Sequence, residues 1–66
     1  MTAFHCYIEH MEVVRDCNIE ADSPAEAAAK AAEREQVCGR WTVIPGKPVY
    51  IDVVERKTYE TAEATT

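Results

Sequence analysis

The sequence predicts a small α+β domain, with one antiparallel four-stranded sheet and a single helix packed on one face. Two segments, 2–9 and 13–21, alternate apolar and polar residues as half-buried strands do. A strong helix start follows at Ser23, and two more apolar segments follow the helix. The element order is therefore ββαββ, which is most simply built as one sheet covered by one helix. Pairing of the first and third strands would give the strand order 2-1-3-4.

The helix is the element with the clearest signals. Ser23 is a good N-cap, Pro24 suits the first helical position, and Glu26 completes a Ser-x-x-Glu capping box. Six of the eight residues from 25 to 32 are alanine, the strongest helix former. We expect the helix to run from Pro24 to about Gln36, with Gly39 in the left-handed conformation after its end. Its alanine face predicts a close approach to the sheet.

The first two strands are expected to form an antiparallel hairpin. Phe4, Cys6 and Ile8 share one face of the first strand, and Cys17 lies on the matching face of the second. A reversal at residues 9–12 would place Cys6 near Cys17 on the buried side. A turn at residues 15–18 is the alternative.

The second half of the chain predicts the other two strands. Residues 40–44 form the third strand, and its Trp41 is favoured as a core anchor over an exposed binding residue. A Pro-Gly-Lys-Pro turn leads to the fourth strand at residues 49–56, with Val49, Ile51 and Val53 facing inward. Residues 57–66 show no apolar period. We therefore expect one domain over residues 1–56 and a disordered polar tail over 57–66.

Composition limits the function. The net charge is −5, from twelve acidic and seven basic residues, which disfavours binding to nucleic-acid phosphates or to anionic membranes. No secretion signal and no apolar run long enough to span a bilayer is visible, so we expect a cytoplasmic protein. The three cysteines at positions 6, 17 and 38 form no Cys-x-x-Cys motif and are interpreted as reduced thiols.

Catalysis and metal binding are both disfavoured. Zinc could be bound only by combining residues from the set His5, Cys6, His10, Cys17 and Cys38. His5 and Cys6 are adjacent on a strand, so they point to opposite faces and cannot share one ion or act as a base and its nucleophile. We expect no metal, no cofactor and no enzymatic activity.

The strongest functional indication is acidic and aromatic. The sheet face away from the helix is expected to be uncovered and to carry both tyrosines and carboxylates, a mixture typical of interfaces. The candidate partner-binding residues are Tyr7, Glu9, Asp16, Glu20, Asp22, Tyr50 and Asp52. The alternative is that these carboxylates only solvate the protein. An uncovered face and exposed edge strands are compatible with a monomer or a homodimer.

Several short stretches also carry a family resemblance. They are Ala3-Phe4, Ile19-Glu20-Ala21-Asp22-Ser23, Ala27, Ala31, Glu35-Gln36, Gly39 and Thr42-Val43. In these residues the chain resembles small phage-encoded anti-CRISPR proteins directed at type I-F systems. The resemblance implies an inhibitor that binds a type I CRISPR effector complex and does not catalyse a reaction.

The acidic character departs from the type I-F pattern, in which polar and basic residues engage the complex. It points instead to DNA-mimicking inhibitors of type I-C and I-E systems, which block the subunit that reads the PAM. The expected partner is the basic DNA-binding surface of a type I effector subunit in the host bacterial cytoplasm, without direct nucleic-acid binding. The alternative is a small acidic antitoxin-like or regulatory module that binds another basic protein.

Overall fold

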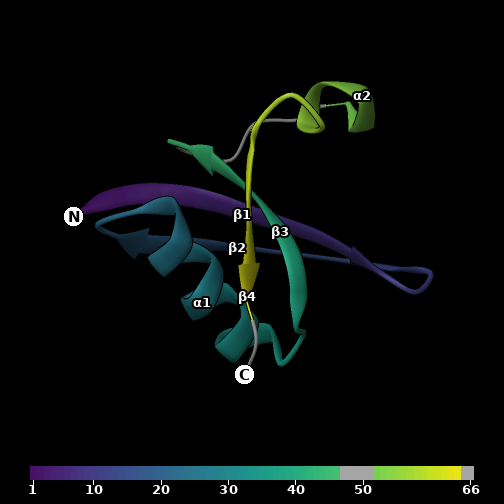
Figure 1. The fold of residues 1–66 in the computed structure, drawn as a ribbon, viewed down its shortest axis with the longest axis horizontal. Helices are drawn as coiled ribbons and strands as arrows, with labels where there is room; N and C mark the ends of the chain where they lie inside the picture. Colours follow the sequence, from purple (N-terminus) through teal and green to yellow (C-terminus); the bar gives the residue numbers. More distant parts are fainter. Residues whose placement is uncertain (47–51, 65–66) are drawn as a thin grey trace.

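A computed structural model describes residues 1–46 and 52–64 and shows one antiparallel sheet in the order β2-β1-β3-β4 (Figure 1). Its elements are β1 (Thr2–His10), β2 (Val13–Ala21), α1 (Pro24–Glu35), β3 (Gly39–Pro45), α2 (Val53–Arg56) and β4 (Glu60–Ala64). The main helix, α1, packs against one face of the sheet. The predicted α+β class, the ββαββ order of its principal elements and the strand order are confirmed.

The β1–β2 hairpin reverses at Met11 and Glu12, so that His10 lies opposite Val13 and Cys6 opposite Cys17. The predicted reversal at residues 9–12 is confirmed, and the alternative turn at 15–18 is wrong. Met11 adopts a φ of 58°, which allows the tight turn although the sequence offers no glycine there.

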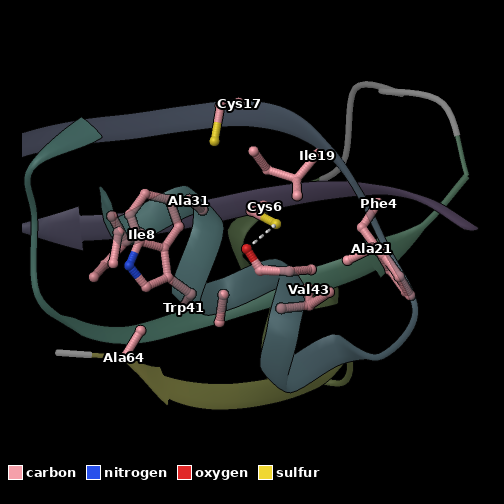
Figure 2. Close-up of a cluster of buried hydrophobic side chains, with 13 residues drawn as sticks. Phe4, Cys6, Ile8, Cys17, Ile19, Ala21, Ala31, Trp41, Val43 and Ala64 are labelled. Carbon is pink, nitrogen blue, oxygen red and sulfur yellow. Dashed lines mark hydrogen bonds between the residues drawn. The ribbon is translucent and has the colours of Figure 1, made fainter. Parts of the chain in front are cut away.

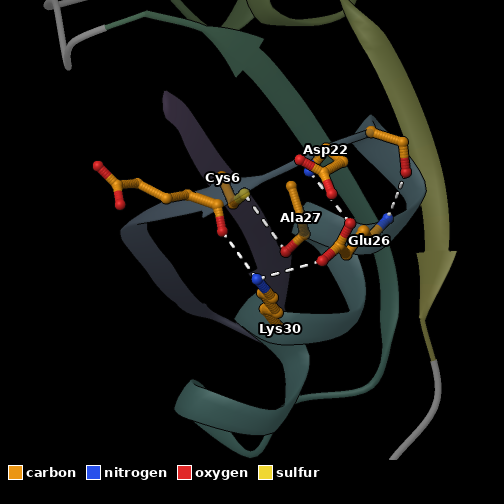
Figure 3. Close-up of polar contacts among 7 residues, drawn as sticks. Cys6, Asp22, Glu26, Ala27 and Lys30 are labelled. Carbon is orange, nitrogen blue, oxygen red and sulfur yellow. Dashed lines mark hydrogen bonds and ion pairs between the residues drawn. The ribbon is translucent and has the colours of Figure 1, made fainter. Parts of the chain in front are cut away.

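Helix α1 begins as its sequence predicts. The Ser23 hydroxyl accepts a hydrogen bond from the backbone N–H of Glu26 at 3.1 Å. The Glu26 carboxylate accepts one from the backbone N–H of Asp22, also at 3.1 Å (Figure 3). The box therefore closes one residue earlier than the usual pattern, in which the third helical residue reaches back to the N-cap itself.

The end of α1 differs from the prediction. The left-handed residue is Gln36, with φ 56°, and not Gly39. The N–H of Val37 donates to the carbonyl of Ala32 at 3.1 Å, as in a Schellman motif, and the N–H of Gln36 donates to the same carbonyl, as in an αL motif. Gly39 instead begins β3 with φ 143°, where an added Cβ would lie 3.1 Å from the Ile8 side chain. The positive φ favours glycine at this position, and the nearby end of the Ile8 side chain leaves little room for a Cβ.

The core lies between α1 and the sheet (Figure 2). Trp41 is its largest fully buried side chain, and its indole nitrogen donates to the carbonyl of Val37 at 3.2 Å. The interpretation of Trp41 as a core anchor is therefore confirmed. The helix contributes only alanines to this core, namely Ala27, Ala28, Ala31 and Ala32, all with no exposed surface. The bulk of the core comes from the strands, as predicted.

The fourth strand is displaced along the sequence. Within the expected strand 49–56, residues 53–56 form α2, while residues 49–51 lie outside the described part of the chain. The sheet is completed by Glu60–Ala64, which pairs with β3. The prediction of a disordered tail is thus wrong for these residues. Backbone pairing with β3 and burial of Ala64 hold this strand in place. Because Ala64 is its only fully buried side chain and is small, the sequence shows almost no apolar alternation from which the strand could be predicted.

Candidate functional site

The sheet face opposite α1 combines two of the predicted site residues from β1 with two from β2. Tyr7 lies directly opposite Asp16 in the β1–β2 register. Glu9 lies two residues further along β1, and Glu20 four residues further along β2. These four therefore share the face to which they were assigned, because side chains of the same parity point the same way and cross-strand partners share a face.

Tyr7 does not offer its ring to a partner. It is only 7% exposed. The Arg56 guanidinium lies over it, 3.9 Å from the ring centre. Its hydroxyl donates to a Glu9 carboxylate oxygen at 2.7 Å. Burial raises the pKa of this hydroxyl, the hydrogen bond to Glu9 raises it further, and Arg56 opposes both effects. The expectation of an uncovered sheet face is wrong at Tyr7, which supports Glu9 and α2 and does not act as an exposed contact.

Asp16 is exposed and held in place by a neighbouring imidazole. Its carboxylate lies 3.4 Å from Nε2 of His5, and 59% of its side chain is accessible. The other ring nitrogen of His5 lies 3.0 Å from the Asn18 amide oxygen. His5 thus joins two residues of β2 and fixes the direction of the Asp16 carboxylate without burying it.

Glu20 and Asp22 continue the line of carboxylates beyond Asp16, and both are exposed. We call Asp16, Glu20 and Asp22 the acidic row. Along an extended chain, two residues advance about 6.6 Å, so Asp16 and Glu20 lie roughly 13 Å apart on β2, and Asp22 follows directly after the end of this strand. Glu9 adds a fourth carboxylate on β1, opposite Val14. The chain therefore gathers four carboxylates near the outer strand, whose edge also carries Lys30 and Arg34 at the carbonyls of Glu20 and Asn18.

Of the remaining two predicted site residues, Asp52 does not join this surface as expected. Asp52 is the N-cap of α2, and its carboxylate accepts from the backbone N–H of Val54 at 3.5 Å. It was assigned to a strand because residues 49–56 alternate, but the Asp cap starts a helical turn there. Tyr50 lies outside the described residues.

Sequence reasoning missed two features of the surface. Basic residues share the face with the carboxylates: Arg40 pairs with Glu63 at 3.2 Å, and Arg56 covers Tyr7. The hairpin tip also exposes three apolar side chains, Met11 (90%), Val13 (49%) and Val14 (54%). Val13 and Val14 are adjacent and interrupt the alternation of apolar and polar residues in the strand. This interruption could have indicated that the hairpin tip exposes an apolar side chain.

The buried thiols are poorly suited to chemistry. The Cys6 thiol donates to the carbonyl of Ala27 at 3.7 Å. Burial, with a smaller effect of Cys17, raises the pKa of Cys6 to about 12. Burial also raises the pKa of Cys17. Among residues 1–46 and 52–64, no group of three His, Cys, Asp or Glu side chains is placed to hold a metal ion.

No family model matches this chain, and comparisons with curated proteins and with solved structures give no match either. Within the described residues, no helix has the length and apolar character needed to cross a membrane. The acidic row and Glu9 together supply four exposed carboxylates near the outer strand of the sheet.

Proposed function

We propose that this protein is an inhibitor that binds a basic, DNA-binding surface of a protein partner and excludes DNA from it. The observation that supports the proposal is the acidic row, whose three carboxylates are all exposed, with Asp16 and Glu20 on the outer strand β2 and Asp22 directly after it. A line of carboxylates can pair with the Lys and Arg side chains that otherwise contact DNA phosphates. The family resemblance directs the proposal to a type I CRISPR effector subunit, in the host bacterial cytoplasm.

The acidic row is suited to this role because its charges remain available. Asp16 retains 59% of its side-chain surface although it contacts His5. Glu20 engages α1 through its backbone carbonyl, which accepts from Lys30 at 2.9 Å, so this bond leaves its carboxylate available. Asp22 likewise uses its backbone N–H and not its side chain to contact Glu26. The row can therefore bind a partner without breaking these three contacts that hold the fold.

The test is competition with DNA for a purified type I effector complex. We expect the triple change Asp16→Asn, Glu20→Gln and Asp22→Asn to weaken inhibition strongly while circular dichroism stays native. Single changes should have small effects, because one exposed ion pair contributes only about 0–1 kcal/mol. Inhibition by the unchanged protein should weaken as salt rises, since exposed charges are screened over about 10 Å at 0.1 M.

A matched control removes three negative charges from other parts of the surface. Glu33, Glu55 and Glu60 are exposed and lie on α1, α2 and β4, away from the row. Changing all three to Gln should leave inhibition intact. Equal loss in both triple variants would show that only net charge matters, and no loss in either would overturn DNA mimicry.

The second candidate is an antitoxin-like or regulatory module that binds another basic protein. The exposed hairpin tip favours it, because Met11, Val13 and Val14 together offer an apolar contact flanked by the acidic residues Glu9 and Glu12. Changing Met11 to Ser and both valines to Thr would separate the two candidates. Loss of partner binding in this variant, with the acidic-row triple unaffected, would favour the second.

A further inference from the structure

A small cavity lies on the sheet face away from α1, near β3 and β4, whereas the acidic row lies at the other edge strand, β2. Its volume is about 220 Å³. Tyr7, Arg40, Thr42, Arg56, Lys57 and Thr61 line it, together with Ile8 and Glu9. β1, β3, α2, β4 and the residue after α2 all contribute, so the cavity exists only in the folded chain. The acidic row contributes none of its residues.

The cavity concentrates positive charge in an acidic protein. Three of the seven Lys and Arg residues line it, against the single carboxylate of Glu9, whereas the whole chain carries a net charge of −5. Glu9 is already engaged there, since it accepts the hydrogen bond from Tyr7. Arg40 is already paired with Glu63 at 3.2 Å, so the charges of Arg56 and Lys57 are the ones that an anion in the cavity would balance.

Arg56 lines the cavity and contains one side-chain nitrogen that has no hydrogen-bond partner among the described residues. Its guanidinium stacks on the Tyr7 ring at 3.9 Å, which fixes the plane of the fork. Its Nε is buried and has no hydrogen-bond partner within the described part of the chain. Buried polar groups are normally satisfied, and a buried guanidinium N–H without an acceptor is costly. Because this nitrogen has almost no accessible surface, an oxyanion in the cavity would be bound by the terminal nitrogens of the same guanidinium.

Arg40 is already held at the opposite side of the cavity. Its Nε donates to the Glu63 carboxylate at 3.2 Å, and one terminal nitrogen donates to the Thr61 hydroxyl at 3.4 Å. These bonds leave N–H groups of the fork for a ligand. The hydroxyl of Thr42, opposite Thr61 in the β3–β4 register, adds a further donor.

We infer that this cavity binds the phosphate group of a small phosphomonoester. Guanidinium forks, an ammonium group and hydroxyls are the donors that phosphate oxygens take, and a doubly charged phosphate balances the cations better than a single carboxylate does. The volume is below the roughly 300–1,000 Å³ of pockets for drug-sized ligands, so the ligand is small or only its phosphate end enters. The inference is independent of the proposed inhibition, because the acidic row takes no part.

The experiment is a titration of the whole protein, followed by amide chemical shifts at constant ionic strength. The probes are inorganic phosphate and glycerol 3-phosphate, with glycerol and acetate as counterparts. We expect saturable shifts at Tyr7, Thr42 and Thr61 with both phosphates and none with glycerol. Arg56→Gln should weaken phosphate binding by about tenfold, and Lys57→Gln by several-fold, as charged donors are lost. Tighter binding of glycerol 3-phosphate than of inorganic phosphate would identify an ester as the ligand.

Arg34→Gln is the matched control, since it removes one positive charge from α1 on the other face of the sheet and should not change the binding. Because Arg56 also packs on Tyr7, Lys57→Gln, at an exposed position, tests the cavity without disturbing that stack. Equal weakening in Lys57→Gln and Arg34→Gln would overturn the inference, since it would indicate attraction by net charge alone. Unsaturable shifts, or acetate binding as tightly as phosphate, would also overturn it.

Discussion

The ammonium group of Lys30 donates to the backbone carbonyl of Glu20 at 2.9 Å and so joins α1 to the outer edge of β2 (Figure 3). One turn later, Arg34 donates to the carbonyl of Asn18 at 3.3 Å. The carbonyl of Ala3, opposite Glu20, accepts from Gly46 on the β3 side of β1. In an antiparallel pair, the backbone groups of two opposite residues either both point toward each other or both point away. Since the Ala3 carbonyl points to β3, the Glu20 carbonyl points away from β1, and so does that of Asn18, two residues earlier. Helix side chains therefore cover part of an open sheet edge.

Because Lys30 and Arg34 cover the β2 edge, removing them should increase self-association. Exposed edge strands invite pairing with another chain, and basic side chains at the edge discourage it. We expect the double change Lys30→Ala and Arg34→Ala to increase association with rising protein concentration, measured by light scattering after size-exclusion chromatography. The double change Arg40→Ala and Lys57→Ala removes the same charge elsewhere and should not. Identical behaviour of the two variants would show that Lys30 and Arg34 do not guard the edge.

Gln36 carries a backbone conformation that glycine adopts more easily. Its φ of 56° closes α1, and a left-handed conformation costs a residue with a side chain about 1 kcal/mol. Gln36→Gly should therefore raise the melting temperature by about 4–8 °C in a chain of this size. Glu33→Gly, inside the helix, should lower it instead. A lower melting temperature for Gln36→Gly would contradict the assigned helix end.

The alanine face of α1 predicts a sharp contrast between neighbouring positions. Ala31 has no exposed surface, whereas Ala29 is exposed on the same helix. Ala31→Leu should destabilise the fold by about 1–3 kcal/mol, because the larger side chain pushes α1 away from the sheet. Ala29→Leu should be nearly neutral. Urea unfolding of the two variants measures the difference, and equal stabilities would mean that the helix does not lie close to the sheet.

Strand β4 should be essential for folding, although it carries few apolar residues. Deleting residues 59–66 removes the partner of β3 and the buried side chain of Ala64. We expect the shortened chain to lose its cooperative thermal transition, measured by circular dichroism. Ala64→Glu should also destabilise strongly, because it buries a carboxylate, while Glu60→Ala at an exposed position should not. A native shortened chain would show that β4 contributes nothing.

The buried thiols predict a dependence on alkaline pH. Burial raises the pKa of Cys6 from 9.0 to about 12, so the folded state holds its proton where the unfolded state loses it. This contribution to stability is complete below pH 9 and is lost as pH rises from about 9 to 12. Cys6→Ala should therefore lose less stability than the unchanged protein between pH 8 and 10, measured by urea unfolding. An equal loss would contradict the burial of this thiol.

The sequence predicted the first half of the fold closely because its signals were local and strong. Alternation placed β2 at its observed bounds, and the Ser-Pro-x-Glu start placed α1. In the second half, the third strand and Trp41 were predicted correctly, but the fourth strand was not, because β4 is held by backbone bonds and by close packing of alanine. Asp52 followed by two valines fits a strand by alternation and a helical turn by capping, and the cap prevailed.

The candidate site was also predicted only in part, because local alternation predicts which face a side chain lies on but not which distant residues cover it. Strand parity correctly put Tyr7, Glu9, Asp16 and Glu20 on one face. It could not foresee that Arg56, nearly fifty residues after Tyr7, would cover the aromatic ring, because that contact depends on the path of the chain after β3. The basic cavity was missed because its residues come from separated elements with no shared spacing.

The small alanine side chains between α1 and the sheet limit which positions of this protein can change during evolution. Ala27, Ala28, Ala31 and Ala32 have no exposed surface, and Ala64 is nearly as buried. Any enlargement there must be matched by a simultaneous reduction on a facing strand, which requires two coordinated mutations. Substitutions should therefore accumulate on the outer face of α1 and at the exposed positions of β2, while the inner face of α1 stays small. The surface can thus be remodelled towards a new partner without altering the fold beneath it.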